Sequence, residues 1–345
     1  MTPDAPHRLI LDGDALVTNW RALAAMSGHA ACGAAVKADG YGLGAREVVR
    51  RLAAAECRDF FVATWAEALG VADLAPSVAV LHGVRAEDMG AVRPANVRPV
   101  LNTAAQVARW KAAGGGACDV MVDTGMNRLG LSVEDVAGGM LDGLAIDTLM
   151  SHLACADEPG HAMNERQRAA FEGLRGRTAA RRLSLANSAG IALGEGYAFD
   201  LTRPGLALYG GVPVPQLAEV IRPVVAIEAQ VLQQRRVAAG AAVGYNATWI
   251  APRETEVGIV NLGYADGYWR GFSDRGHAEA EGKRLPVIGR VSMDLVALDV
   301  SGAGVGEGDW VRLAFDLPEA ARFSGMSQYE LLTGLGQRLQ RVWRA

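Results

Sequence analysis

The strongest constraint on the fold is a repeat of buried strands and amphipathic helices between residue 30 and about residue 210. The apolar runs are short and continuous, which is typical of strands buried on both faces of a parallel sheet. Segments with helical spacing lie between them, such as residues 45–56, 103–114 and 164–177. The eight strand candidates read, in order, ACGAAVKA, DFFVATW, VAVLHG, VRPVLN, CDVMVDTG, IDTLMSHL, RRLSLANS and FDLTRPG.

Eight such repeats in roughly 180 residues predict a (β/α)8 TIM barrel rather than a doubly wound sheet, which usually has fewer strands. Beyond about residue 220 the pattern changes to turn-rich β segments without amphipathic helices between them. We therefore predict an α/β barrel over residues 10–222 and a C-terminal mainly β domain over residues 223–345. The segment RLILD precedes the barrel, and we expect residues 1–9 to pair with the β domain.

Composition excludes several classes of function. The net charge of −4 and the pI of about 5.9 argue against nucleic acid or an anionic membrane as the main partner. No apolar run approaches bilayer length and the N-terminus has no secretory signal pattern, so we expect a cytoplasmic protein. Its four cysteines are far apart in the chain and form no C-x-x-C pair, which predicts reduced thiols.

Lysine is scarce in this chain. Of the 34 lysine and arginine residues, only Lys37, Lys111 and Lys283 are lysines. An arginine cannot act as a nucleophile at neutral pH, whereas a desolvated lysine can lose its proton and attack a carbonyl. Lys37 ends the first predicted strand, in the stretch VKADGYG. Taken alone, this position also fits an ordinary lysine at the surface.

Further polar residues follow the other predicted strands. The carboxyl ends of barrel strands share one rim, where the chemistry of TIM barrels is found. An amine on that rim, with a helix start in NSAG and a turn glycine in RPG, would suit a phosphate whose attached carbonyl reaches Lys37. That combination indicates pyridoxal phosphate, although each motif alone also fits a helix cap or a turn. The rim residues are Lys37, Asp123, Arg128, His152, Asn187, Ser188 and Arg203.

The motifs taken together resemble those of bacterial alanine racemases, in the same order and over nearly the whole chain. They are AAVKADGYGLGA, VDTGMNRLG, SHLACADE, NSAG, RPGLALYGG, VGYNATW, NLGYADG and GRVSMD. Related decarboxylases share the barrel, but the chain has no HIGSQ-like segment or triple-glycine phosphate loop. A decarboxylase or lyase of this fold is one alternative, and a pyridoxal phosphate-binding protein without turnover is another.

The resemblance implies a role for each matching residue. Lys37 would form a Schiff base with pyridoxal phosphate and act as one base, with Tyr245 of the partner subunit as the opposite base. Positive charge relayed from His152 and Arg203 would help Tyr245 to ionise. Arg203 would also face the pyridine nitrogen, and Arg128 the phenolic oxygen. His152 would be a further cofactor contact. Phosphate contacts would come from Tyr41, Ser188, Gly205 and the backbone of Leu206. Substrate contacts would come from Arg128, Tyr264 and the backbone N–H of Met293.

The resemblance implies a homodimer that interconverts L-alanine and D-alanine. The D-alanine would be supplied for peptidoglycan synthesis. Racemisation needs two acid/base groups on opposite faces of one carbon, which a lysine and a tyrosine can provide. We expect no metal, because the histidines and cysteine near His152 match no zinc spacing. We also expect the side chain of Met293 to pack within an apolar strand.

Two positions depart from the family pattern. Many members carry a carbamylated lysine that steadies the arginine, and this chain has Met121 at that position. Asn102 or a bound anion would then hold Arg128. Near the C-terminus the family often has a phosphate-positioning tyrosine, where this chain has Gln337.

Overall fold

The structure is a computed structural model that describes residues 5–90 and 93–345. It divides into two compact units. Leu16–Arg222 form the barrel unit, whereas the segment that ends at Ala15 joins Pro223–Ala345 in the β unit. Residues 1–4, which belong to the segment predicted to pair with the β domain, lie outside the described residues.

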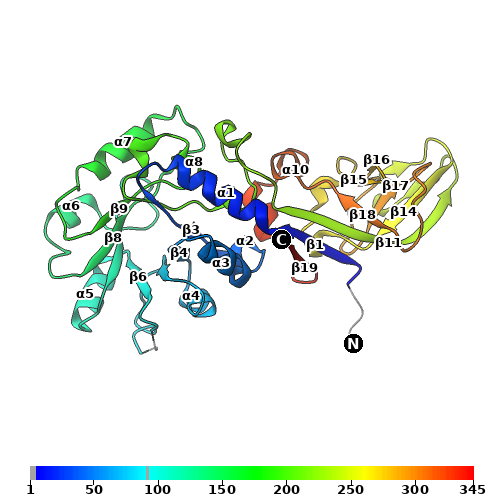
Figure 1. Cartoon of the computed structure of the whole chain (residues 1–345). Helices are drawn as coiled ribbons and strands as arrows, with labels where there is room; N and C mark the ends of the chain where they lie inside the picture. The colour runs from blue at the N-terminus through cyan, green and yellow to red at the C-terminus, as the bar shows by residue number, and fades with distance from the viewer. Residues whose placement is uncertain (1–4, 91–92) are drawn as a thin grey trace. The chain divides into compact units, whose positions relative to one another are not determined.

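The barrel unit contains parallel strands at all eight predicted positions, so the predicted TIM barrel is confirmed (Figure 1). Seven strands pair in chain order from β3 to β9, and β10 pairs with β2. Backbone bonds also connect the segments around β9 and β10, for example Asp200 N–H to the Leu183 carbonyl at 3.0 Å and Arg203 N–H to the Ala186 carbonyl at 2.9 Å. The strands are β2 (Ala31–Cys32), β3 (Ala34–Ala35), β4 (Asp59–Val62), β5 (Ser77–Val80), β6 (Val97–Leu101), β7 (Cys118–Met121), β8 (Ile146–Met150), β9 (Arg182–Ser184) and β10 (Leu201–Thr202).

Helices connect these strands around the outside of the barrel (Figure 1). The first amphipathic segment buries Val48, Val49 and Leu52 on one face, as its helical spacing predicts. Side chains of Thr64 and Thr103 cap the N-termini of the next two helices and satisfy their free N–H groups. The helical segments are α1 (Gly13–Met26), α2 (Lys37–Tyr41), α3 (Ala45–Ala54), α4 (Trp65–Val71), α5 (Ala104–Ala112), α6 (Val133–Ala137), α7 (Ala162–Glu172), α8 (Ser188–Ile191), α9 (Glu195–Ala198), η1 (Leu206–Tyr209) and η2 (Pro215–Leu217).

The β unit is organised around β11 (Val225–Val237), the longest strand described. This strand pairs with β1, β14 and β18, and β1 also pairs in parallel with β19. The other strands are β1 (His7–Asp12), β12 (Ala242–Val243), β13 (Trp249–Ile250), β14 (Thr255–Val260), β15 (His277–Ala280), β16 (Lys283–Pro286), β17 (Val296–Asp299), β18 (Trp310–Leu313) and β19 (Gln340–Arg344). The helical turns are η3 (Tyr245–Ala247), η4 (Tyr264–Asp266), η5 (Arg270–Phe272), α10 (Leu317–Ser324) and α11 (Gln328–Thr333).

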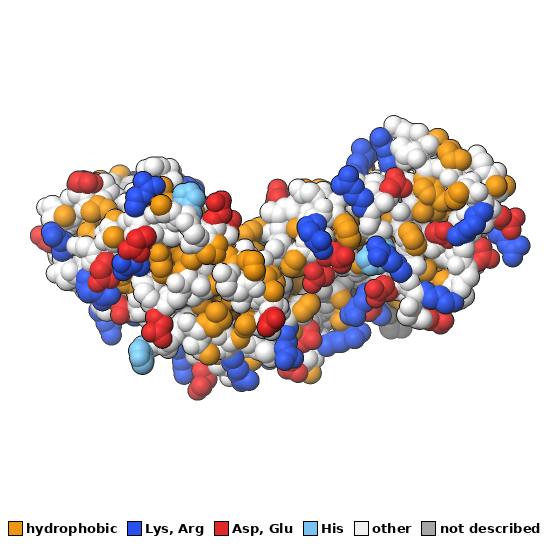
Figure 2. Space-filling view, turned by 90° about the horizontal axis from the view of Figure 1, so that it is seen from above, with side chains coloured by type: hydrophobic (Ala, Val, Ile, Leu, Met, Phe, Trp, Pro, Cys, Tyr) orange, Lys and Arg blue, Asp and Glu red, His pale blue; other side chains and the backbone are white. Residues whose placement is uncertain are grey.

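The surface carries charges of both signs. Figure 2 shows basic and acidic side chains interspersed over the face in view, which agrees with the small net charge of −4. Among the described helices, none is both long enough and apolar enough to span a bilayer.

Candidate active site

Lys37 lies two residues after the end of β3, at the first position of α2. The next four residues, Ala38 to Tyr41, have φ values of 53°, 53°, 63° and 57° and form a left-handed turn. Only the glycine at position 40 adopts this conformation without steric cost. A bond of 2.7 Å from Ala38 N–H to Glu67 Oε1 holds the start of the turn. The amine of Lys37 is therefore carried on a stiff backbone at the carboxyl rim of the barrel.

The surroundings of Lys37 favour its neutral amine. Burial lowers the pKa of this group, and the positive charges of Arg128 and Arg203 lower it further. The carboxylate of Glu67 opposes this shift without cancelling it. A lysine with a lowered pKa is a better nucleophile and base near neutral pH, which is the property that the chemistry at this position requires.

Tyr41 and Gly205 fit closely against each other. The Tyr41 ring stacks on Tyr209 with centroids 4.6 Å apart, and the Tyr209 hydroxyl donates to the Ala35 carbonyl at 2.8 Å. A Cβ added to Gly205 would lie 2.2 Å from the Tyr41 hydroxyl oxygen. The turn after β10 therefore requires glycine, because any side chain would displace the Tyr41 hydroxyl.

Ser188 gathers hydrogen-bond donors at the ends of β9 and β10. Its Oγ accepts from the N–H groups of Gly205 at 3.0 Å and Ala207 at 3.2 Å, which leaves its own hydroxyl proton to donate. The N–H of Leu206, between them, has no acceptor among the described residues. Such a set of hydroxyl and backbone donors is suited to a phosphate group.

Arg203 is buried at the end of β10. Its guanidinium donates to Ser184 Oγ and, at 2.6 Å, to the carbonyl of Ser151. Burial lowers the pKa of Arg203 to about 10, with the carboxylate of Asp119 opposing the shift. The group therefore stays cationic at neutral pH.

His152 carries no charge at neutral pH. Burial lowers its pKa to about 3, and the positive charges of Arg203, Arg128 and Lys37 add to the effect. No bond between the side chains of His152 and Arg203 is present in the part of the chain described. Positive charge at this position therefore belongs to Arg203, and His152 can act only as a neutral donor or acceptor.

The support of Arg128 was predicted to depend on Met121 and Asn102, which lie at the ends of neighbouring strands. The Arg128 backbone N–H donates to Asp123 Oδ2 at 3.2 Å, and its exposed guanidinium has no partner among the described residues. Met121 ends β7 and is buried. Asn102 follows β6, which pairs with β7, and donates to the carbonyls of Leu81 and Val100. Its Oδ1 atom is buried without a partner and is available to a cation.

The β unit presents the other three residues named from the sequence. Tyr245 lies in η3, between β12 and β13, and is 66% exposed. Tyr264 begins η4. Met293 lies before β17 with its side chain 54% exposed, so the prediction that it packs inside a strand is wrong. The Met293 N–H has no acceptor among the described residues, which leaves it available to bind a carboxylate.

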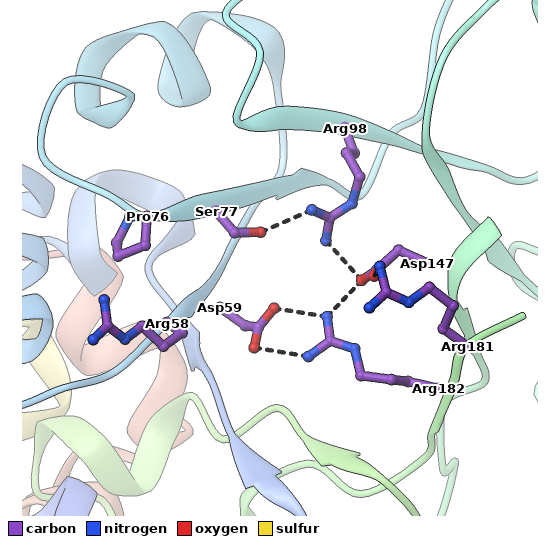
Figure 3. Close-up of a pocket in the computed structure, with 8 residues that line it drawn as sticks. All are labelled: Arg58, Asp59, Pro76, Ser77, Arg98, Asp147, Arg181 and Arg182. Carbon is purple, nitrogen blue, oxygen red and sulfur yellow. Dashed lines mark hydrogen bonds and ion pairs between the residues drawn. The ribbon is translucent and has the colours of Figure 1, made fainter. Parts of the chain in front are cut away.

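The opposite end of the barrel carries a cavity of ≈ 390 Å³ (Figure 3). Arg182 donates to Asp59 at 2.8 and 2.9 Å and to Asp147 at 2.6 Å, while Arg98 bridges Ser77 and Asp147. These side chains come from the first residues of the strands and largely neutralise one another. The network therefore ties the strands together at the end remote from Lys37.

Two charged residues close to Tyr264 and Met293 were not predicted from the sequence. Asp266 lies in η4, in the quoted motif NLGYADG, and is fully buried. Arg338 follows Gln337 and donates to Asp266 through Nε at 2.8 Å and through an Nη atom at 3.0 Å. An aspartate in a glycine-rich turn reads as a turn former, so nothing in the local sequence points to its distant arginine.

The residues of the barrel rim fit pyridoxal phosphate. Ser188, the N–H of Leu206 and the glycine at 205 suit its phosphate, and the amine of Lys37, with its lowered pKa, suits its aldehyde. The described residues include no group of three histidine, cysteine or acidic side chains that could hold a metal ion. The fold and this site together define a barrel enzyme of the pyridoxal phosphate-dependent class.

Comparisons with known proteins identify the family. Residues 11–213 match the model of the alanine racemase N-terminal domain, and residues 224–343 match that of the C-terminal domain. The chain belongs to the alanine racemase family.

Individual relatives agree over their whole length. The catabolic alanine racemase of Mesorhizobium japonicum is 41% identical, over 96% of this chain and 92% of its own. The biosynthetic alanine racemase of Agrobacterium fabrum is 40% identical, over 98% and 94%. The crystal structure of alanine racemase from Bartonella henselae, with covalently bound pyridoxal phosphate, superimposes with a TM-score of 0.91 at 33% identity, over 99% of this chain and 100% of that chain.

Proposed function

We propose that this chain interconverts L-alanine and D-alanine with pyridoxal phosphate. The observation that carries the proposal is the amine of Lys37 on the barrel rim, with its pKa lowered, in a chain of the alanine racemase family. The same rim carries Arg203 and the phosphate donors around Ser188, so a single bound molecule could contact all three.

Each rim residue has a proposed part in holding the cofactor. Tyr41, Ser188, Gly205 and the N–H of Leu206 bind the phosphate, and Arg128 the phenolic oxygen. Arg203 faces the pyridine nitrogen and, being cationic, disfavours its protonation. When bound, pyridoxal phosphate supplies an aldehyde for Lys37 and an electron sink that acidifies the α-carbon proton of the substrate.

Two side chains move the proton. Lys37 serves one face of the α-carbon and Tyr245 the other, so that removal on one face is followed by delivery on the opposite face. Tyrosine has a pKa of about 10 in water and needs a cation nearby to act as a base. Arg203 supplies that charge and His152 is a neutral hydrogen-bonding group beside it. The N–H of Met293 binds the substrate carboxylate, and Tyr264 lines its path of access.

We also propose a homodimer in which Tyr245 and Met293 of the partner subunit complete each site. Both residues are more than half exposed in the single chain, and Ile250 and Leu295 of the same unit are exposed as well. Large exposed apolar side chains that gather in one unit are typical of surfaces covered by a partner.

Racemisation is tested by incubating the purified enzyme with L-alanine in deuterated water. D-Alanine that carries α-deuterium is the expected product, because the returning proton comes from solvent. Release of carbon dioxide would instead show a decarboxylase. Cofactor binding without exchange would show a carrier protein, and either result would overturn the proposal.

The attachment of the cofactor is tested separately by borohydride reduction and peptide mapping. The label is expected on Lys37. The chain offers only two other lysines, so a label on Lys111 or Lys283 would contradict the assignment.

For the cell we propose a cytoplasmic enzyme that supplies D-alanine to peptidoglycan. The four cysteines are free thiols, which fits a reducing compartment. The biosynthetic name of the Agrobacterium relative supports this role, and the catabolic name of the Mesorhizobium relative supports alanine breakdown instead. Deletion of the gene should make growth depend on added D-alanine, whereas failure to grow on alanine alone would indicate the catabolic role.

A further inference from the structure

We propose that Arg338 is a positioning residue for substrate binding, which rests on the function proposed above. Its guanidinium joins two segments of the β unit. One is η4, which begins at Tyr264, and the other is the loop 291–295, which contains Met293. These segments carry the two proposed substrate contacts of this unit.

The two segments already touch through their backbones. Tyr264 N–H donates to the carbonyl of Ser292 at 3.1 Å, and Ala265 N–H to the carbonyl of Met293 at 3.1 Å. A Cβ on Gly263 would lie 2.2 Å from the Met293 carbonyl oxygen. The position of η4 therefore determines where the Met293 peptide lies.

Arg338 binds one carboxylate on each segment. Two of its nitrogens donate to Asp266 at 2.8 and 3.0 Å, and a third donates to Asp294 Oδ1 at 2.8 Å. Asp266 is fully buried and also accepts from Gly263 N–H at 3.0 Å. Asp294 directly follows Met293. One planar guanidinium with three donors thus fixes both segments. Its two carboxylate partners lie two residues after Tyr264 and one residue after Met293, the two proposed substrate contacts.

The loop that carries Arg338 is itself fixed against η4. Gly336 N–H donates to the Asp266 carbonyl at 3.0 Å. A Cβ on Gly267 would lie 2.5 Å from the carbonyl oxygen of Gly334, so the two backbones are in direct contact. The guanidinium is therefore held with η4 and has little freedom to follow the loop 291–295 if that loop moves.

An ion pair that serves only stability would have a different consequence. Loss of a stabilising contact lowers the melting temperature but leaves the affinity for substrate unchanged in the folded fraction. Loss of a positioning contact raises KM for alanine, because the Met293 N–H binds substrate in both the ground state and the transition state.

Two variants separate these cases. Arg338→Lys keeps a positive charge beside Asp266, but an ammonium cannot reach both carboxylates at once. Asp294→Asn weakens only the ion pair between Arg338 and the loop 291–295. The Asp294 side chain is 46% exposed, so the variant should fold. The matched control is Arg253→Lys, which alters another exposed arginine of the β unit, paired with Asp299 at 3.3 Å.

We expect both test variants to raise KM for L-alanine about tenfold while kcat changes less than threefold, and the control to change neither. Amide hydrogen exchange measured by mass spectrometry is the second readout and does not need activity. Exchange over residues 263–267 and 291–295 should become faster in the test variants but not in the control.

If KM and hydrogen exchange were unchanged in Asp294→Asn, the inference would be overturned, because the arginine would then serve only stability. This result decides the question even if Arg338→Lys fails to fold. If the wild-type enzyme does not racemise alanine, the proposed function fails. The exchange experiment would still show whether Arg338 holds the two segments together.

Discussion

At the scale of the residue, the glycine at position 205 is a sharp test of the phosphate site. Gly205→Ala places a methyl group 2.2 Å from the Tyr41 hydroxyl oxygen, so the tyrosine must move. Forced packing of this kind costs about 1–3 kcal/mol, and this cost carried over to phosphate binding is a loss of about 5- to 150-fold in affinity. Titration of the apoenzyme with pyridoxal phosphate measures this loss.

The control for that experiment is Gly70→Ala. A Cβ at this position meets no atom within 4 Å, so the affinity should stay at the wild-type value. Equal affinity in Gly205→Ala and wild type would show that Tyr41 takes no part in binding the phosphate.

The charge of Arg128 controls the reactivity of Lys37. After burial, Arg128 is the largest cause of the lowered pKa of this lysine. Arg128→Gln removes a positive charge that disfavours the ammonium form, so the pKa should rise and less neutral amine should be present at pH 7. Reductive methylation of the apoenzyme, read by peptide mapping over a range of pH, should show the midpoint for Lys37 at higher pH. Lys111 in the same samples is the internal control, and a parallel shift there would contradict the explanation.

At the scale of the element, α2 stores backbone strain next to Lys37. Ala38 has φ 53° and ψ 48°, a left-handed conformation that glycine adopts freely and alanine does not. Ala38→Gly should therefore raise the free energy of unfolding by up to about 1 kcal/mol. Ala53→Gly in α3 should lower it by about 1 kcal/mol, because glycine is unfavourable in a right-handed helix. Urea denaturation of both apoproteins gives the comparison, and a loss of stability in both would show that the left-handed turn does not form in solution.

Asp119, the second residue of β7, lies 3.4 Å from Arg98 in the network at the strand starts and makes stability depend on pH. Burial raises the pKa of Asp119 to about 6, Arg98 opposes this shift, and Asp147 adds to it. The folded state therefore holds this proton more strongly than the unfolded state. The resulting stability is complete below about pH 4 and is lost as the pH rises through 6.

Asp119→Asn removes this effect because an amide does not ionise. The free energy of unfolding of the variant, relative to wild type, should therefore increase by about 2 kcal/mol between pH 4 and pH 7. Asp147→Asn is the control with the opposite sign. Burial raises the pKa of Asp147, but the hydrogen bond and charge of Arg182 together with Arg98 lower it below the ordinary value. If the free energy of unfolding of Asp119→Asn relative to wild type did not change with pH, Arg98 would neutralise the carboxylate fully.

The sequence alone predicted the barrel strands but not the left-handed turn or the long-range contacts. Continuous apolar runs predicted all eight barrel strands, because burial on both faces leaves a strong local signal. The left-handed turn after Lys37 left no such signal, since Ala38 and Asp39 are ordinary helix or loop residues. The contact of Arg338 with Asp266 spans 72 positions, and local patterns do not encode contacts of that range. The resemblance to a family supplied the candidate residues Tyr245 and Met293, whereas periodicity alone would have placed both in strands.

At the scale of the whole molecule, the proposed dimer predicts complementation between two inactive variants. Lys37→Ala removes one proposed base and Tyr245→Phe removes the other. If each site takes Lys37 from one subunit and Tyr245 from its partner, a mixed dimer contains one site in which both residues are intact. Random mixing of equal amounts makes half of the dimers mixed, so about a quarter of the wild-type activity should return.

The opposite arrangement gives a different result from the same mixture. If both residues of a site came from one chain, every site in a mixed dimer would lack a base and no activity would return. Mixing Lys37→Ala with the double variant Lys37→Ala/Tyr245→Phe is the control, because no combination of these chains contains Lys37. The α-deuterium assay measures both mixtures, and mass spectrometry of the intact dimers shows whether subunits exchanged. Mixed dimers without recovered activity would place Tyr245 outside the site of the partner subunit.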